Sequence, residues 1–292
     1  MEQNKKTIGI LTFEKYHGRR DVGSSRIRGH WLIKYWDEAE LFKPGKKYKV
    51  CLYQKAYFVE HAKAFSGIKI LDLCDPEFLH WSYRTKQMLK EVDAVTTSTE
   101  SLAEAIRKFT DKPVVYIPDR VDLEFHKETR RLHQGRAKWV VWFGYSAGFD
   151  MIKPVLHFLK KHNLNLIVIS NKLFNLPASY YDHIELKNLP WKLETVNEDI
   201  VSADIVINPQ SKKGKWKYKS NNKTITAWAL GMPVANDVEE LEKFLDGEER
   251  QKESQKKLQE VKELYDVKIS VNEYQELISK IAKEKYATSG SD

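Results

Sequence analysis

Residues 220–235 have the composition of a helix that binds an anion at its start. The segment reads Ser-Asn-Asn-Lys-Thr-Ile-Thr-Ala-Trp-Ala-Leu-Gly-Met-Pro-Val-Ala. The polar residues 220–222 can cap a helix, Gly231 can end it and Pro233 prevents its continuation. Free backbone N–H groups and the positive end of the helix dipole attract an anion, and Lys223 adds a full charge beside them. This chemistry suits a diphosphate, although any capped helix after a strand has a similar pattern.

The rest of the chain alternates short apolar runs with helical patterns. This alternation predicts an α/β protein in which helices cover both faces of parallel sheets. Residues 139–143 are an expected strand that ends in a glycine-containing turn, residues 144–148, and Asp150 can cap the helix after it. A basic, polar stretch, residues 123–138, separates the two halves as a linker. The other expected strands are residues 7–12, 49–53, 68–73, 94–97, 114–117, 166–170, 184–186, 205–208 and 234–236.

Composition limits the class of protein. The chain has 292 residues, of which 41% are hydrophobic and 31% charged, as in a soluble globular protein of one or two domains. No apolar run reaches the roughly 18 residues of a membrane span, and the first residues lead into a strand rather than a signal peptide. We therefore expect a cytoplasmic protein. The net charge of +8 favours an anionic partner, such as nucleic acid, a membrane surface or a phosphorylated ligand.

Five stretches carry a resemblance to a known family. In chain order they are Asp93-Ala-Val-Thr-Thr-Ser-Thr-Glu-Ser-Leu, Val115-Tyr-Ile-Pro-Asp-Arg-Val-Asp122, Phe143-Gly144, Ala203-Asp-Ile-Val-Ile-Asn-Pro209, and residues 223–234 with their Ala-x-Gly-x-Pro-Val ending. Together they resemble the two-domain GT-B glycosyltransferases, particularly the family 4-like enzymes of bacteria and phages that use nucleotide sugars. The resemblance implies two doubly wound, Rossmann-like domains facing a cleft. Residues 1–122 would form the acceptor-side domain, residues 139–271 the donor domain, and a C-terminal helix, residues 272–287, would pack back on the first domain.

Two positions depart from the pattern of the resembled family. Thr226 stands where a glutamate commonly binds the donor, five residues before the helix-ending glycine. Asp119 and Arg120 replace the usual Asn-Gly pair. The expected fold survives both changes, but the identity of the donor and the choice between retention and inversion stay open.

The resemblance and the local chemistry together give a set of expected donor-site residues. Lys223 would stabilise the leaving diphosphate electrostatically. An inverting enzyme would use Asp75 as its general base, although Asp75 could equally cap the following helix. The chain has no Asp-x-Asp, and Cys51 and Cys74 are its only cysteines, so we expect no metal and no other cofactor to be required. The expected donor-binding residues are Gly144, Ser146, Ser170, Asn171, Asn222, Lys223, Thr224 and Thr226.

Basic and aromatic residues alternate in an expected loop of the first domain, residues 17–31, a region that faces the acceptor in the resembled family. Arginines among aromatic side chains suit phosphate contacts and base stacking. A second basic run, residues 212–219, could extend this surface, with a solvated loop as the alternative. Trp191 could line the donor base or pack in the core. The expected acceptor-binding residues are Arg19, Arg20, Ser25, Arg26 and Arg28.

These expectations predict a hexosyltransferase that uses a nucleotide sugar, a UDP-hexose such as UDP-glucose, and a hydroxyl acceptor. The expected acceptor is a 5-hydroxymethylpyrimidine in DNA, such as hydroxymethylcytosine, as in the DNA-modifying enzymes of some phages. A phage-encoded protein would act in the host cytoplasm. A glycolipid or cell-surface polysaccharide is the alternative acceptor, because a membrane surface would also explain the charge. A non-catalytic nucleic-acid-binding protein on a GT-B scaffold is a second alternative, and a sugar-nucleotide epimerase is a third.

Overall fold

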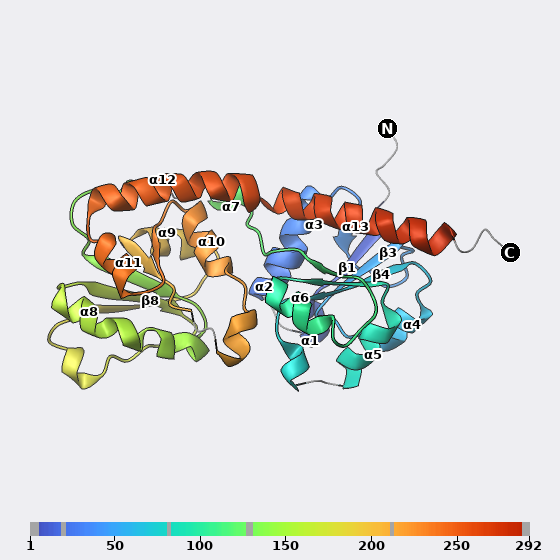
Figure 1. Cartoon of the computed structure of the whole chain (residues 1–292), viewed down its shortest axis with the longest axis horizontal. Helices are drawn as coiled ribbons and strands as arrows, with labels where there is room; N and C mark the ends of the chain where they lie inside the picture. The colour runs from blue at the N-terminus through green and yellow to red at the C-terminus, as the bar shows by residue number, and fades with distance from the viewer. Residues whose placement is uncertain (1–5, 19–21, 81–82, 127–130, 211–212, 288–292) are drawn as a thin grey trace. The chain divides into compact units, whose positions relative to one another are not determined.

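The computed structural model describes residues 6–18, 22–80, 83–126, 131–210 and 213–287 (Figure 1). The chain forms two compact units. The first unit contains Met1–Arg120, Lys213–Ser220 and Asp266–Asp292, and the second contains Val121–Lys212 and Asn221–Tyr265. Residues 213–220, which the sequence places in the donor domain, therefore lie with the first unit.

Six parallel strands, counted over the described residues, form the sheet of the first unit in the order β2-β1-β3-β4-β5-β6. The order reverses between β1 and β3, which is the switch point of a doubly wound sheet. The edge strand β2 is not predicted from the sequence because its three residues, Ala39–Leu41, contain Glu40 and no apolar run. The other strands are β1 (Ile8–Leu11), β3 (Val50–Gln54), β4 (Ile68–Leu73), β5 (Ala94–Thr97) and β6 (Val114–Tyr116).

Two helical regions of the first unit differ from the sequence prediction. The region 17–31, expected as a loop, is largely helical where it is described. The C-terminal helix α13 (Val267–Ala287) begins earlier than residue 272, where the sequence predicts its start, and it packs against α3 (Trp31–Tyr35) and β4 (Figure 1). The remaining helical segments are α1 (Phe13–His17), α2 (Gly23–Ser25), η1 (Arg26–His30), α3 (Trp31–Tyr35), α4 (Val59–Ala64), η2 (Glu77–His80), α5 (Tyr83–Glu91), α6 (Glu100–Ile106) and η6 (Gly214–Tyr218).

Five parallel strands form the sheet of the second unit where the chain is described, in the order β11-β10-β7-β8-β9. The order reverses between β7 and β10, so this sheet also has a switch point. The expected strand 184–186 lies too early, because Ile184 closes a turn onto Tyr180 and the pairing with β8 starts at Leu186. The strands are β7 (Trp139–Phe143), β8 (Asn165–Ser170), β9 (Leu186–Pro190), β10 (Ile205–Ile207) and β11 (Val234–Ala235).

Alternate residues of β7 pack into two different cores. Val140 and Trp142 face the cluster that includes α8 (Leu156–Lys161) and α11 (Val238–Lys243), whereas Val141 and Phe143 face the cluster that includes α9 (Val196–Val201) and α10 (Asn222–Ala229). The period of two in a strand causes this division, so helices cover both faces of the sheet. The remaining segments are α7 (Leu123–His126), η3 (Ser146–Met151), η4 (Lys153–Val155), η5 (Ala178–Tyr180) and α12 (Gly247–Leu264).

The helix expected after Asp150 begins later than predicted. Residues 146–155 form the short 3₁₀ turns η3 and η4, and the α-helix itself starts at Leu156. Pro154 contributes to this difference because it has no backbone N–H for a regular helical bond. Asp150 therefore lies within η3, where it pairs with Lys153 at 2.7 Å, instead of capping a helix.

Candidate active site

The switch point of the second sheet brings several expected donor residues to one edge. Gly144 follows β7, Ser170 ends β8, and Asn208 follows β10. Because all strands are parallel, their carboxyl ends meet at the same edge of the sheet. Open α/β sheets bind ligands at this edge, beside the point where the strand order reverses.

The turn after β7 requires glycine. Gly144 has a φ of 149°, a backbone conformation that side chains rarely adopt, and a Cβ there would lie 3.0 Å from the Nζ of Lys223. The same ammonium lies 4.8 Å from the centroid of the Trp142 ring, which gives a cation–π contact. The absence of a side chain at Gly144 thus lets the charge of Lys223 approach the backbone turn.

The loop after β8 braces this turn. The hydroxyl of Ser170 donates to the carbonyl of Gly144 at 2.7 Å, and the side-chain oxygen of Asn171 accepts from the backbone N–H of Ser146 at 2.9 Å. Four of the expected donor-binding residues are therefore connected by two hydrogen bonds. Ser170 is buried, whereas Asn171 is exposed and can turn its amide toward a ligand.

The start of α10 is joined to β10 by one buried contact. The amide of Asn208 donates to the hydroxyl of Thr224 at 2.9 Å, and the two residues are only 4% and 5% exposed. Among the described residues, the side chain of Asn221 makes no capping bond at this helix start. Residues 220–222 therefore do not cap the helix as expected, because Ser220 bonds elsewhere. Sequence reasoning missed Asn208, although a polar residue directly after a strand is a usable signal.

Thr226 and Lys223 occupy one face of α10, because residues three apart in a helix are neighbours. Thr226 is half-buried at the position where the resembled family has a glutamate. Trp191 is half-buried against the core cluster of α9 and α10, and its backbone N–H donates to the carbonyl of Ser170 at 3.1 Å. This position favours the packing interpretation of Trp191.

At the carboxyl edge of the first sheet, Asp75 lies between two lysines. One carboxylate oxygen contacts the ammonium of Lys55 and the other contacts that of Lys219. Burial alone would raise the pKa of Asp75, but the two ammonium groups lower it below its ordinary value. A carboxylate held in this way is a weak proton acceptor, and the role of Asp75 as general base stays a prediction.

Lys55 is a buried residue of this edge that the sequence did not single out. It directly follows β3, its φ is 50°, and its ammonium lies 4.4 Å from the Phe13 ring and 3.5 Å from a carboxylate oxygen of Glu77. A non-glycine residue in the left-handed region stores strain and is enriched at functional sites. Burial opposes the charge of Lys55, but the neighbouring Cys74 and Asp75 raise its pKa, so the ammonium form is stabilised.

Arg28, expected to bind the acceptor, lies instead inside the first unit. Its guanidinium is 3% exposed and bonds Asp72 at 2.6 Å, Asp119 at 2.9 Å and the carbonyl of Ile117 at 2.9 Å. Burial would lower the pKa of Arg28, but the facing carboxylates raise it, so the charge is fixed. The sequence could not reveal this role because the partners lie 44 and 91 residues away.

The other expected acceptor residues are not assembled into one surface by the described part of the chain. Ser25 is fully buried and donates to the side chain of Gln54 at 3.0 Å. Arg26 is half-buried, with its guanidinium 5.7 Å from the Trp31 ring. Arg19 and Arg20 lie outside the described residues. In the described part of residues 17–31, Ser25 and Arg28 therefore lie in the interior, which the alternation of basic and aromatic residues does not predict.

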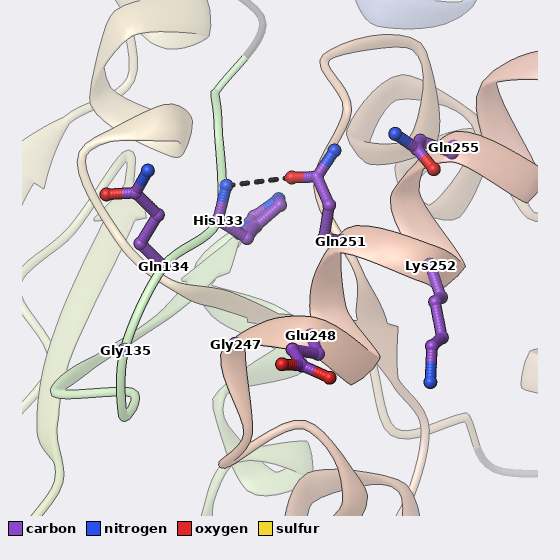
Figure 2. A pocket seen from close by; sticks show the side chains of 8 residues that line it. All are labelled: His133, Gln134, Gly135, Gly247, Glu248, Gln251, Lys252 and Gln255. Carbon is purple, nitrogen blue, oxygen red and sulfur yellow. Dashed lines mark hydrogen bonds between the residues drawn. The ribbon is translucent and has the colours of Figure 1, made fainter.

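A cavity of about 460 Å³ lies elsewhere in the second unit (Figure 2). Its eight lining residues belong to residues 133–135 and to the first turns of α12, and all differ from the expected site residues. The backbone N–H of His133 donates to Gln251 at 3.0 Å across this region. Because residues 133–135 precede β7, the cavity lies toward the amino edge of the sheet, opposite the Gly144 turn. We therefore place no reaction there.

Two features bear on metals and membranes. Within the ranges that the structure describes, three or more His, Cys, Asp or Glu residues nowhere come together as a metal site. Cys51 and Cys74 are free and buried, and burial raises the pKa of each thiol to about 12. The expectation that no metal is required stays a prediction. No helix among the described residues is long and apolar enough to cross a membrane.

Comparison with solved structures identifies the architecture. HepE from Anabaena, crystallised with UDP and glucose, superposes with a TM-score of 0.63 over 95% of this chain and 99% of its own, at 10% sequence identity. The fold is GT-B. This finding confirms the expected α/β class with two doubly wound parallel sheets.

Further GT-B structures are similar over most of the chain. An α-glucosyltransferase crystallised with UDP-glucose and DNA containing an abasic site has a TM-score of 0.56 at 12% identity, covering 79% of this chain and 80% of its own. Trehalose-6-phosphate synthase from Burkholderia multivorans has a TM-score of 0.56 at 11% identity, covering 82% and 72%. No protein-family model matches the sequence, and no curated protein matches it. These identities establish the GT-B fold and nothing finer.

Proposed function

We propose that the chain is a glycosyltransferase that transfers a hexose from a UDP-sugar to a hydroxyl acceptor. The observation that supports it most is the position of the Lys223 ammonium. It lies beside the switch point of the second sheet, 3.0 Å from where a Cβ on Gly144 would stand. The GT-B structures with UDP and with UDP-glucose support the same class of donor.

In this proposal the second unit stabilises the departing nucleoside diphosphate. Negative charge grows on the diphosphate as its bond to the sugar breaks, and a fixed positive group lowers the energy of that state. Lys223 supplies the charge, and the start of α10, with Asn222 and Thr224, supplies N–H groups oriented by the helix. Gly144 and Ser146 contribute backbone atoms of the turn that Ser170 and Asn171 brace. Thr226 lies one helical turn after Lys223 and would meet the sugar. No metal takes part.

The proton of the acceptor hydroxyl has two possible routes. An inverting enzyme would use Asp75 as base, which requires the Lys219 contact to open so that one carboxylate oxygen becomes accessible. A retaining enzyme does not need this base. Measuring the anomeric configuration of the product by NMR separates the two courses, and retention would remove the catalytic role proposed for Asp75.

For the acceptor we favour a 5-hydroxymethylpyrimidine in DNA. The net charge of +8 suits a polyanion, and a GT-B enzyme of the same fold has been crystallised with DNA. The test offers radiolabelled UDP-glucose with hydroxymethylcytosine DNA, unmodified DNA, and vesicles of glycolipid acceptor. Label in the modified DNA alone supports the proposal, whereas label in the lipid fraction alone refutes the DNA acceptor.

A second experiment tests whether the protein is an enzyme. Lys223→Ala should abolish both transfer and slow hydrolysis of UDP-glucose while circular dichroism stays native. Lys256→Ala is the matched control, because Lys256 is an exposed lysine of α12 in the same unit. Wild-type protein that binds DNA but neither transfers nor hydrolyses any of several UDP-hexoses would identify a non-catalytic DNA-binding protein instead.

A further inference from the structure

Residues 213–220, called the strap here, connect two parts of the second unit but lie with the first. The strand before the strap, β10, and the helix after it, α10, both belong to the second unit. The strap folds as the short helix η6, followed by Lys219, whose backbone is extended, and Ser220. Its position is therefore decided by contacts to the first unit and not by its neighbours in sequence.

Two hydroxyl groups at the start of α6 hold the backbone of the strap. Thr99 donates to the carbonyl of Tyr218 at 3.2 Å, and Ser101 donates to the carbonyl of Lys217 at 3.0 Å. The Tyr218 ring meets Phe78 edge to face, with 5.0 Å between ring centroids. These contacts fix the direction of the strap before its last two residues.

Two carboxylates of the first unit hold the last residues. Lys219 contacts Asp75, and the hydroxyl of Ser220 donates to Asp119 at 2.5 Å. Asp119 is 4% exposed, and its other oxygen accepts from Arg28 at 2.9 Å. Ser220 is thus bonded to a carboxylate that is itself fixed in the interior, and such charge-assisted bonds are stronger than neutral ones.

We propose that Asp75 and Asp119 are positioning residues that hold the strap and, through it, the start of α10 in the conformation that binds a nucleoside diphosphate. The helix begins at Asn222, two residues after Ser220, and Lys223 is its second residue. When the binding segment is already ordered, the free energy of binding is not reduced by the entropic cost of ordering that segment. This proposal rests on the proposed function and gives Asp75 a role other than that of a base.

The two roles of Asp75 predict opposite effects of removing Lys219. If Asp75 is the general base, Lys219→Met frees one of its oxygens and raises its pKa, so transfer at neutral pH stays the same or increases. If Asp75 holds the strap, the same substitution loosens the start of α10, and UDP binding weakens. Lys219→Arg keeps the charge and should restore wild-type behaviour.

The experiment measures UDP affinity by calorimetry in full-length variants. We expect Lys219→Met and Ser220→Ala to weaken UDP binding by about three- to tenfold, with kcat reduced less than kcat/KM. Lys219→Arg and Ser220→Thr should stay within about twofold of wild type, because each keeps the bonding group. The control is Lys215→Met, an exposed strap lysine whose ammonium lies 5.2 Å from the strap's own Trp216.

Hydrogen exchange of the free protein provides a readout that does not depend on the ligand. Backbone amides of residues 222–226 should exchange faster in Ser220→Ala than in wild type. Wild-type UDP affinity in both Lys219→Met and Ser220→Ala would overturn the strap proposal and leave the proposed function intact. Wild-type protein that does not bind UDP would refute the proposed function. Unchanged hydrogen exchange at the start of α10 in Ser220→Ala would, independently of that result, refute the strap proposal.

Discussion

The carboxyl edges of the two sheets use cationic side chains in different ways. At the edge of the second sheet, the Lys223 ammonium lies beside the Gly144 turn and the Trp142 ring. At the edge of the first sheet, Lys55 and Arg28 each face carboxylates. We propose that the second edge offers its charge to an anionic ligand, whereas in the first edge the cations stabilise the protein itself. A basic residue reveals its role only with its partners.

The largest effect that tests this difference is expected from Arg28→Met. Removing the guanidinium leaves Asp72 and Asp119 buried and uncompensated, which should cost about 3–5 kcal/mol of unfolding free energy. Urea denaturation measures it. Arg26→Met, at a half-buried arginine of the same segment, is the control and should cost below about 1 kcal/mol. A small loss for Arg28→Met would show that the first edge does not depend on its internal charges.

The opposite pattern is expected from Lys223→Met. Loss of a charged hydrogen bond to a phosphate should weaken UDP binding by roughly 10- to 100-fold, corresponding to about 1.5–3 kcal/mol. The unfolding free energy should change by less than about 1 kcal/mol, because Lys223 is only half-buried and methionine keeps apolar contact with the Trp142 ring. Calorimetry and urea denaturation of one preparation measure both quantities. Unchanged UDP binding would show that Lys223 does not bind the ligand, and the proposed difference between the two edges would be wrong.

Gly144→Ala should have a smaller effect on binding that also involves the fold. A φ of 149° strains any residue with a Cβ, and the new atom would lie 3.0 Å from the Lys223 ammonium and 3.3 Å from the Trp142 ring. The lysine can move away, so we expect a loss of about 1–3 kcal/mol in stability and weaker UDP binding. Gly45→Ala, at a glycine outside the strap with positive φ but open space around it, separates backbone strain from crowding.

The smallest expected effect is the pH dependence of the stability contributed by the cluster around Asp75. This cluster consists of Asp75, Lys55, Lys219 and Glu77. The pKa of Asp75 is lowered in the folded protein, so its ion pairs stabilise the fold fully above the ordinary carboxyl value of about 3.9 and are lost as the pH falls through the lower folded value. Burial raises the pKa of the neighbouring Glu77, which therefore takes up its proton first.

Asp75→Asn should accordingly be less stable than wild type by about 1 kcal/mol at pH 7, because Asp75 and its partner Lys219 are partly exposed to solvent. This difference should shrink as the pH is lowered below about 3.9. Unfolding free energies of the two proteins at pH 7 and near pH 3 provide the comparison. A difference that persists at low pH would show that Asp75 acts through packing and not through its charge.

Much of the fold is predictable from local patterns. The strands β4, β5 and β7 begin and end at the expected residues, because each is a run of four to six mostly apolar residues between polar ones. The glycine turn and the helix with Lys223 are likewise local signals. The strap and the cluster around Asp75 are not, because their contacts join residues 101 and 144 positions apart. Only the folded chain shows that a segment leading into α10 belongs with the first sheet.

The departures from the family pattern at positions 119 and 120 illustrate the same limit. Asp119 bonds Arg28 and Ser220, while Arg120 bonds Glu273 on α13 at 2.8 Å and Ser270 at 2.9 Å. Each replacement has an oppositely charged partner far along the chain. From the sequence, Asp119 and Arg120 only show that the family's usual Asn-Gly pair is missing. The structure shows that both residues form ion pairs inside the first unit.

The return of α13 to the first unit affects the order in which the protein can be completed. Tyr274 stacks on Trp36 with 6.0 Å between ring centroids, and its hydroxyl bonds Asp72 at 2.9 Å. A ribosome produces Trp36 early and Tyr274 late, with the whole second unit between them. Domains generally fold as units during synthesis, beginning with the N-terminal one. Here the unit that is synthesised first exposes part of its core until α13 emerges, so it is the last to reach its final structure.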